Sequence, residues 1–379
     1  MKVLFVVPPL TGHVNPTVSI AAALGARGHD VAWAGHGERV ASLLPAGARL
    51  ESLGELPGDV VTAIAERSKR VRGLESVQFL WQDFLVPLAR QMRPAVEQVI
   101  RAYRPDVIVA DQQAVGGALA ARRLGVPWAT LCTTTAALVE PLAGFPKVKA
   151  WIDGQLVALQ DQAELPVVEN ADLSPSRVIV LSTRALAGDA PVPPQVEWVG
   201  PAFSDRPDDA PFPWEALPPA PRVLVSLGTV SAERGAPFYA AVVAGVRAGA
   251  ILVAPPELVP SPPPNVLVRA RVPQLALLRH VDAVVTHAGH NTVCESLAHG
   301  LPLVCAPIRD DQPVIAGQVQ AAGAGLRVRF AHPSPDSIGG AVARVLGEPA
   351  FRAAAERIRR SFVEAGGAAR AAGLVEAVS

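Results

Sequence analysis

Short, uninterrupted hydrophobic runs alternate with Ala-rich helical segments along most of the chain. The first run covers residues 2–7, an Ala-rich segment covers 17–27, and the next run covers 29–34. Continuous apolar runs of this length are typical of parallel strands that are buried on both faces. The chain is therefore predicted to open with a βαβ unit. Residues 11–16 form its turn, and Pro16 takes the first helical position.

The same alternation continues through both halves of the chain. In the first half it predicts strands at 106–110, 127–133 and 177–182, a helix at 117–124 and a long amphipathic stretch at 76–103, whereas 136–175 show little pattern. In the second half it predicts strands at 222–226, 250–254, 266–269, 282–286 and 302–306, with helices near 238–247, 337–346, 350–363 and 368–378. Strands that alternate with helices favour an α/β fold with doubly wound parallel sheets.

A proline-rich segment divides the alternation in two. Seven of the 21 residues from 201 to 221 are proline, which is typical of an interdomain linker. We expect a first domain over 1–200 and a second over 222–360, facing one another across a cleft. We also expect the C-terminal helix, 361–379, to pack back on the first domain.

The stretch from 271 to 325 has the clearest chemical pattern. A predicted strand stops at His287 and Gly289, a helix follows with Glu295 one turn in, and the next strand ends before Asp311 and Gln312. These polar residues therefore lie beyond the carboxyl ends of strands, where ligands bind in such folds.

Each of these positions suits part of one ligand. The helix start binds phosphate oxygens, and Gly289 lets the backbone approach them closely. Glu295 can accept from the two hydroxyls of a ribose, and Asp311 and Gln312 can bind sugar hydroxyls. The set indicates a nucleoside diphosphate that carries a sugar. Neither GxGxxG nor GxxxxGK[ST] follows a predicted strand, so dinucleotide and P-loop sites lack their motif.

His13 and Asp111 are expected at one edge of the first sheet. A histidine at a helix start is held neutral, which suits a general base, although a loop or capping histidine is the alternative. Asp111 ends a strand, where it either caps the next helix or orients the imidazole of His13.

Composition excludes several classes of protein. Lys plus Arg equals Asp plus Glu, at 34 each, which argues against nucleic-acid binding. The three cysteines have no metal or disulfide spacing, so a reducing cytoplasm is expected. The first apolar run is too short for a signal peptide, and no window approaches the roughly 18 apolar residues of a membrane helix.

Residues 271–325 resemble the signature segment of the UDP-glycosyltransferase superfamily, the inverting GT-B enzymes that include bacterial antibiotic transferases. The matching residues are Pro273-Gln274, His280, His287-Ala288-Gly289-His290-Asn291-Thr292, Glu295, Gly300-Leu301-Pro302 and Asp311-Gln312. Plant members carry Trp where Arg271 and His290 stand. At both positions this sequence resembles the bacterial members of the superfamily.

The resemblance implies a role for each matched position. His13 would be the general base and Asp111 its partner. The nucleotide sugar would be bound by Ser226, Gly228, Thr229, Arg271, Val272, Gln274, His287, Gly289, His290, Asn291, Thr292, Glu295, Asp311 and Gln312. By composition and analogy, an apolar acceptor would contact Trp81, Phe84, Leu138 and Phe145.

The sequence therefore predicts an inverting transferase that moves a sugar from a UDP- or dTDP-linked donor. The acceptor would be a hydroxyl or nitrogen of a small apolar natural product. We expect no metal, no stable membrane insertion, and a monomer or homodimer. A catalytically silent, transferase-like partner and a sugar-nucleotide epimerase are the alternatives. The first could lack His13 and Asp111, and the second would need further acid–base groups near the donor.

Overall fold

The computed structural model describes residues 1–55, 67, 71, 73–136, 138, 145–203, 210–228 and 235–378. The chain forms two compact units. Unit 1 contains residues 1–182, 191–204 and 365–379, and unit 2 contains residues 183–190 and 205–364.

Unit 1 is built on a parallel sheet that has seven strands in the described residues, in the order β3-β2-β1-β4-β5-β6-β7. The strands are β1 (Lys2–Val6), β2 (Asp30–Gly35), β3 (Arg49–Ser52), β4 (Val107–Asp111), β5 (Trp128–Cys132), β6 (Val178–Val180) and β7 (Val196–Trp198). The helices are α1 (Thr11–Gly25), α2 (Gly37–Ala41), α4 (Leu74–Phe79), the π-helix η1 (Leu80–Leu85), α5 (Val86–Tyr103), α6 (Val115–Leu124), α7 (Pro146–Gln162) and α15 (Gly367–Glu376).

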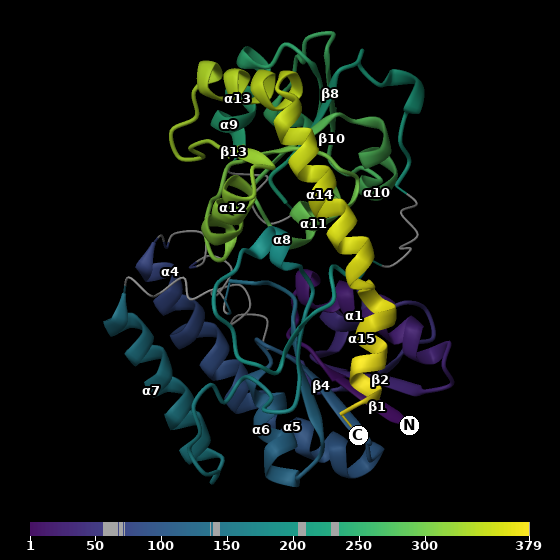
Figure 1. The fold of residues 1–379 in the computed structure, drawn as a ribbon, viewed down its shortest axis with the longest axis vertical. Helices are drawn as coiled ribbons and strands as arrows, with labels where there is room; N and C mark the ends of the chain where they lie inside the picture. Colours follow the sequence, from purple (N-terminus) through teal and green to yellow (C-terminus); the bar gives the residue numbers. More distant parts are fainter. Residues whose placement is uncertain are drawn as a thin grey trace. The chain divides into compact units, whose positions relative to one another are not determined.

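Helices cover both faces of this sheet. Val3 and Phe5 of β1 pack in one core with α1 and α15, which lie side by side in Figure 1. Leu4 and Val6, which alternate with them along the strand, pack in the opposite core with α5 and α6. Because successive side chains of a strand point to opposite faces, a strand covered on both sides must be apolar throughout. The predicted buried parallel strands are thus confirmed.

Two helices of unit 1 differ from the sequence prediction. The expected turn at 11–16 is the start of α1, where the N–H groups of His13 and Val14 both donate to the Leu10 carbonyl. Pro16 therefore lies inside α1, not at its first position. The poorly patterned stretch 136–175 contains the 17-residue helix α7, which buries only Leu156, Leu159 and Gln160 and so has no long apolar stripe.

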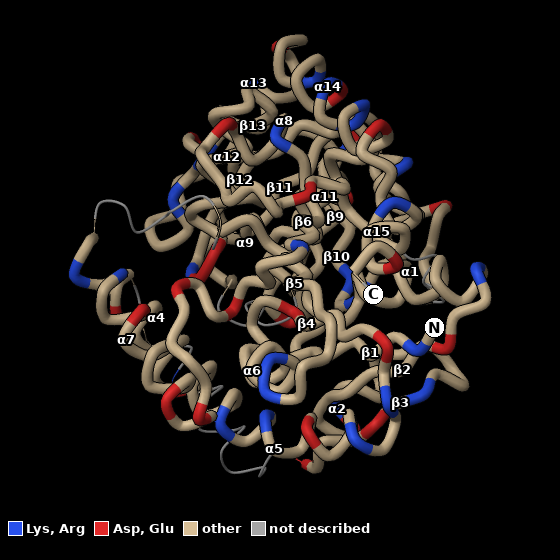
Figure 2. The backbone as a smooth tube through the Cα atoms, turned by 60° about the horizontal axis from the view of Figure 1, so that its bottom comes forward, with Lys and Arg blue, Asp and Glu red and all other residues tan. Residues whose placement is uncertain are grey.

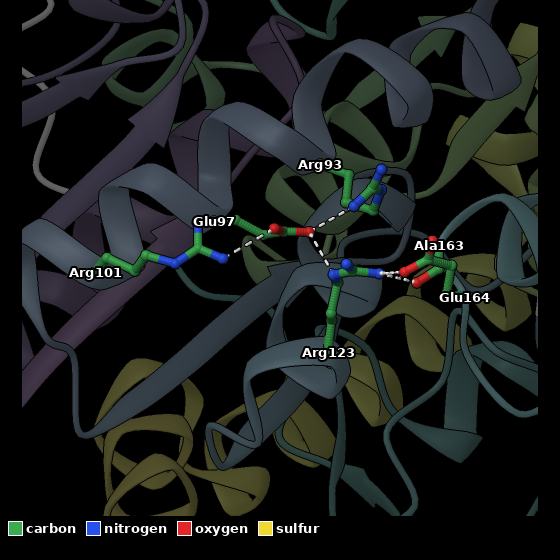
Figure 3. A network of polar contacts seen from close by, with 6 residues as sticks. All are labelled: Arg93, Glu97, Arg101, Arg123, Ala163 and Glu164. Atoms are coloured by element: carbon green, nitrogen blue, oxygen red, sulfur yellow. Dashed lines mark hydrogen bonds and ion pairs between the residues drawn. The ribbon is translucent and has the colours of Figure 1, made fainter.

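An ion-pair network holds the end of α7 against α5 and α6. The side chain of Glu97 on α5 is almost buried, and it pairs with Arg93 at 2.5 Å, Arg101 at 3.3 Å and Arg123 of α6 at 3.6 Å (Figure 3). Arg123 also donates to the carbonyl of Ala163 and pairs with Glu164 at 3.0 Å, just after α7. Arg123 thus links the Glu97 carboxylate on α5 to the segment that follows α7.

Unit 2 repeats the architecture around a parallel sheet of six strands in its described part, in the order β10-β9-β8-β11-β12-β13. The strands are β8 (Arg222–Ser226), β9 (Gly249–Val253), β10 (Val266–Arg269), β11 (Ala283–Thr286), β12 (Leu303–Cys305) and β13 (Gly325–Arg327). The helices are α8 (Arg184–Ala187), η2 (Trp214–Ala216), α9 (Ala236–Gly245), η4 (Pro256–Leu258), α10 (Gln274–Leu277), η5 (Leu278–His280), α11 (His290–Ala298), α12 (Gln312–Ala321), α13 (Pro335–Gly347) and α14 (Pro349–Ala365). One core packs under α9 and α13, and the other under α11, α12 and α14.

The division into units differs from the expected boundaries at residues 183–190 and at both ends of the second domain. Residues 183–190 group with unit 2, because Leu186 packs in its core with Leu224 and Ile251. Residues 365–379 group with unit 1, where Val375 packs near α1. Residues 204–209 of the proline-rich segment lie outside the described residues.

The distribution of charged residues and the hydropathy of the helices bear on whether the protein has a charged or membrane-binding surface. Basic and acidic residues are interspersed along the tube in Figure 2, in keeping with their equal numbers. Among the described residues, no helix combines the length and the hydropathy that crossing a bilayer requires.

Candidate active site

The strand order of unit 1 places one polar cluster at its topological switch point. The order changes direction between β1 and β4, and ligands of doubly wound sheets bind beyond the carboxyl ends of such strands. His13 lies in the first turn of α1, which follows β1, and Asp111 is the last residue of β4. The structure brings these two predicted residues together.

Asp111 and His13 are in direct contact. The Nδ1 atom of His13 is 2.9 Å from both carboxylate oxygens of Asp111. The Asp111 side chain is fully buried, whereas the His13 side chain is 13% exposed. The carboxylate also accepts a hydrogen bond of 2.8 Å from the backbone N–H of Gln113, which fixes its orientation.

A third residue, Thr133, completes this cluster and was missed by the sequence analysis. Its hydroxyl donates to Asp111 Oδ2 at 3.1 Å and lies 2.8 Å from His13 Nδ1. Thr133 directly follows β5, the strand next to β4, so its position was the only available signal.

These contacts assign the tautomer of a neutral His13. A carboxylate only accepts hydrogen bonds, so the Nδ1 atom that faces Asp111 carries the proton. The lone pair of the ring then lies on Nε2. This is the arrangement of an imidazole that can take a proton at Nε2 while Asp111 stabilises the resulting imidazolium.

Unit 2 has its own switch point between β8 and β11, and His287 lies there. The ring of His287 lies close to two glycines. A Cβ atom on Gly228, which follows β8, would be 2.8 Å from Cε1, and one on Gly289 would be 2.6 Å from Nε2. Neither position accepts a larger residue without moving the ring, so both glycines hold His287 by close backbone approach.

The backbone around His287 forms a sharp turn into α11. Ala288 has a φ of 67°, a left-handed conformation that is uncommon for a residue with a side chain. Its N–H donates to Thr286 Oγ1 at 3.3 Å. Gly289 is the N-cap residue of α11, so the first N–H groups of a nine-residue helix follow directly. Such helix starts attract phosphate groups.

The electrostatic setting of His287 favours a neutral ring in the free protein. Burial lowers the pKa of His287, while a hydrogen bond with the Ser226 backbone and the charge of Asp311 oppose the shift. A neutral ring has one N–H group and one acceptor nitrogen. A nearby phosphate would favour the imidazolium, whose two N–H groups can donate to the Ser226 backbone and to the phosphate at the same time.

Glu295 and Gln274 form a second contact near the same edge. Glu295 on α11 is 4% exposed, and its Oε2 atom accepts a 2.5 Å hydrogen bond from Gln274 Nε2 on α10. The Gln274 amide thereby orients this buried carboxylate.

Gln312 organises the loop that precedes α12. Its Oε1 atom accepts from the backbone N–H groups of Ile308 at 2.9 Å and Arg309 at 3.1 Å. The carbonyl end of the side chain is therefore used by the loop, and only the amide NH₂ can reach a sugar hydroxyl. Asp311 is the N-cap residue of α12 beside it.

The remaining predicted donor residues are divided between buried and exposed positions. Ser226 ends β8 and is buried, whereas Arg271 is exposed and Val272 packs on a core. His290 is buried, and its Nε2 atom is 3.5 Å from Cys294 Sγ one turn along α11. Asn291 and Thr292 are partly exposed in the first turn of α11. Thr229 lies outside the described residues.

The four expected acceptor residues do not share one apolar cluster among the described residues of unit 1. Trp81 and Phe84 lie on η1 and pack against different cores. Leu138 is buried with Cys132, and Phe145 is 47% exposed. Leu138 thus contributes to the core in this structure.

Comparison with known proteins agrees with the fold. The C-terminal domain model of erythromycin biosynthesis protein CIII-like proteins matches residues 243–372. Over 419 residues, covering 99% of both chains, the chain is 30% identical to 4'-demethylrebeccamycin synthase of Lentzea aerocolonigenes. It is 28% identical to demethyllactenocin mycarosyltransferase of Streptomyces fradiae, covering 99% of this chain and 86% of that protein.

A solved structure extends the likeness to three dimensions. CalG4, the calicheamicin glycosyltransferase, matches with a TM-score of 0.80 at 26% identity, covering 100% of this chain and 98% of the other. Two doubly wound parallel domains and this likeness define a glycosyltransferase of the GT-B fold, which uses a nucleoside diphosphate sugar. The chain belongs to the family of GT-B glycosyltransferases that act in antibiotic and natural-product pathways.

Proposed function

We propose that this enzyme inverts the anomeric configuration of the sugar it transfers, with His13 as the general base. The contact between His13 and Asp111 carries this proposal. A buried carboxylate 2.9 Å from Nδ1 directs the lone pair of the neutral ring to Nε2. That nitrogen can take the proton of an acceptor group.

The proposed reaction is a single displacement. The acceptor O–H or N–H proton moves to His13 Nε2, and the acceptor atom forms a bond with the anomeric carbon. The bond from that carbon to the diphosphate oxygen breaks on the opposite side, and the nucleoside diphosphate leaves with both electrons. Attack from the side opposite the leaving group inverts the configuration. A positioned base of this kind contributes about a hundred- to ten-thousandfold to rate.

We assign donor binding to unit 2. His287 and the N–H groups at the start of α11 bind the diphosphate and stabilise it as it leaves, so the chemistry needs no metal ion. Glu295 accepts from the ribose hydroxyls in the orientation that Gln274 sets. Asp311 and the amide NH₂ of Gln312 bind the sugar. The helix dipole and an imidazolium supply the positive charge.

The donor is a uracil or thymine nucleotide sugar, and the acceptor is a hydroxyl or nitrogen of a small apolar natural product. The names of the relatives support this acceptor class, since both belong to antibiotic biosynthesis. Apolar side chains on η1, which include Trp81 and Phe84, are only partly buried and suit such a molecule.

Product stereochemistry tests the inverting reaction. UDP-glucose and dTDP-glucose, both α-linked, are incubated with a panel of phenolic and polyketide acceptors in the presence of EDTA. Proton NMR of the product is expected to show a β-linkage. An α-linked product would contradict the single displacement, and loss of turnover in EDTA would contradict metal-free departure. Thermal stabilisation by UDP against dTDP identifies the base, because binding raises apparent stability.

A further inference from the structure

Thr133 makes two different contacts with the base and its partner. Its Oγ1 atom is 2.8 Å from His13 Nδ1 and 3.1 Å from Asp111 Oδ2. The residue is 3% exposed, and it follows β5, which pairs with β4 in parallel so that Leu131 lies opposite Asp111. Three neighbouring elements therefore meet at this hydroxyl.

The hydroxyl donates and accepts at once. A threonine hydroxyl has one O–H donor and two lone pairs. Since the carboxylate only accepts, the O–H points to Asp111 Oδ2, and a lone pair is left facing the Nδ1–H of His13. The hydroxyl thus shares the Asp111 charge with the imidazole and limits rotation of both side chains. Its own rotation is restricted, because threonine is branched at Cβ.

We propose that Thr133 is a positioning residue for proton transfer by His13. This inference rests on the proposed function of His13 as the base. Thr133 acts through Asp111 and His13 and fixes the ring plane, so that Nε2 points in one direction when an acceptor arrives. The sequence does not single out Thr133, because two further threonines follow it directly.

Removal of the hydroxyl has a consequence for the base. The hydrogen bond to the Asp111 carboxylate is charge-assisted, and such bonds are roughly twice as strong as neutral ones. Without it, more of the carboxylate charge is directed at His13, which favours the imidazolium. The other titratable neighbour, the Cys132 thiol, stays neutral, because burial and the charge of Asp111 raise its pKa. The Nδ1–H group also loses its contact with the Thr133 oxygen, so the pH at which His13 becomes protonated should change.

The chain offers a matched set of variants. Thr133→Val keeps the shape and removes the hydroxyl, and Thr133→Ser keeps the hydroxyl. Thr130→Val is the control, because Thr130 is also buried on β5 but its hydroxyl contacts the Asp172 carbonyl and the Ser174 N–H. Each variant is also combined with His13→Ala.

Kinetics with UDP-glucose or dTDP-glucose and a flavonol acceptor measure the effect on turnover. For Thr133→Val we expect kcat to fall about ten- to a hundredfold with donor KM unchanged within about twofold. Thr133→Ser should restore kcat to within about threefold of wild type, and Thr130→Val should leave it unchanged. In the His13→Ala background, Thr133→Val should have no further effect, as expected for residues that act as a unit.

A titration of free enzyme gives a second readout that needs no substrate. With labelled histidine, NMR follows His13, whose signal is identified by its loss in His13→Ala. The midpoint should differ from the wild-type value in Thr133→Val and return in Thr133→Ser. An unchanged midpoint in Thr133→Val, or an equal loss of kcat in Thr130→Val, would overturn the role of Thr133. Wild-type turnover in His13→Ala would instead overturn the base, and with it the proposed function.

Discussion

Substitution of Gly228 by alanine tests how closely unit 2 holds His287. Gly228 has a φ of 74°, and an added Cβ would lie 2.8 Å from Cε1 and 2.9 Å from Nε2 of the His287 ring. The Gly289 backbone also lies close to this ring, since a Cβ added there would be 2.6 Å from Nε2. Gly228→Ala must therefore displace the imidazole.

The size of the effect follows from two separate costs. An alanine with this positive φ costs roughly 1–2 kcal/mol of stability. Ordinary van der Waals contact begins near 3.4 Å, so the ring must move by 3.4 − 2.8 = 0.6 Å. A hydrogen bond to a charged group contributes about 1.5–3 kcal/mol, and its loss weakens binding about ten- to a hundredfold.

Gly323→Ala is the matched control, because it carries the backbone cost of a positive φ without displacing a ring. Gly323 has a φ of 75°, and its added Cβ would meet only Ala354 Cβ at 3.7 Å. Both variants should lose a similar amount of thermal stability. Calorimetry with UDP and dTDP should show weaker binding for Gly228→Ala alone. Equal affinity in the two variants would refute the contact between His287 and the diphosphate.

Three further predictions concern single side chains. Glu295→Gln should weaken UDP binding at least about tenfold in calorimetry, because a buried carboxylate that accepts two ribose hydroxyls is lost, whereas unchanged affinity would contradict its role. Glu97→Gln should lower the free energy of unfolding in urea by about 2 kcal/mol, since it leaves partly buried arginines without their carboxylate, while the more exposed Glu356→Gln should change it by less than about 0.5 kcal/mol. Burial lowers the pKa of His36, so the unfolded chain binds more protons below the ordinary value of 6.5 and stability should fall as the pH falls through it. His36→Asn should flatten this loss of Tm between pH 7.5 and 5.5, and an unchanged slope would contradict it.

The strands and the sheet edge were predictable because their signal is local. A strand covered by helices on both faces must be apolar at every position, so β1 and β4 were found as continuous runs to within about two residues. Parallel strands end at one edge of a sheet. For this reason the sequence alone placed His13 and Asp111 on the same edge.

Helices with weak local signals were mispredicted. α1 begins with Gly12, Asn15 and Pro16, which are poor helix formers, yet the Leu10 carbonyl accepts two N–H groups and starts the helix there. α7 lacks an apolar stripe. Its far end is held instead by arginine side chains of α5 and α6. Tertiary contacts of this kind have no signal in the pattern of hydrophobic residues.

Side-chain partners within the site depend on strand register and helix packing. Thr133 reaches His13 only because β5 pairs with β4, and a sequence pattern does not specify which strands are neighbours. The Gln274 amide donates to Glu295, and His290 Nε2 lies 3.5 Å from Cys294 Sγ within α11, and no sequence pattern indicates either contact. The residue types pointed to a nucleotide sugar, while the contacts that orient them required the structure.

The most direct test of the central claim is the turnover of His13→Ala beside its affinity for the donor nucleotide. His332→Ala, at an exposed position of unit 2, serves as the control for a lost histidine. The account predicts that kcat of His13→Ala falls about a hundred- to ten-thousandfold, with the Kd for UDP or dTDP within about twofold of wild type. Wild-type turnover in His13→Ala would contradict the assignment of His13 as the general base.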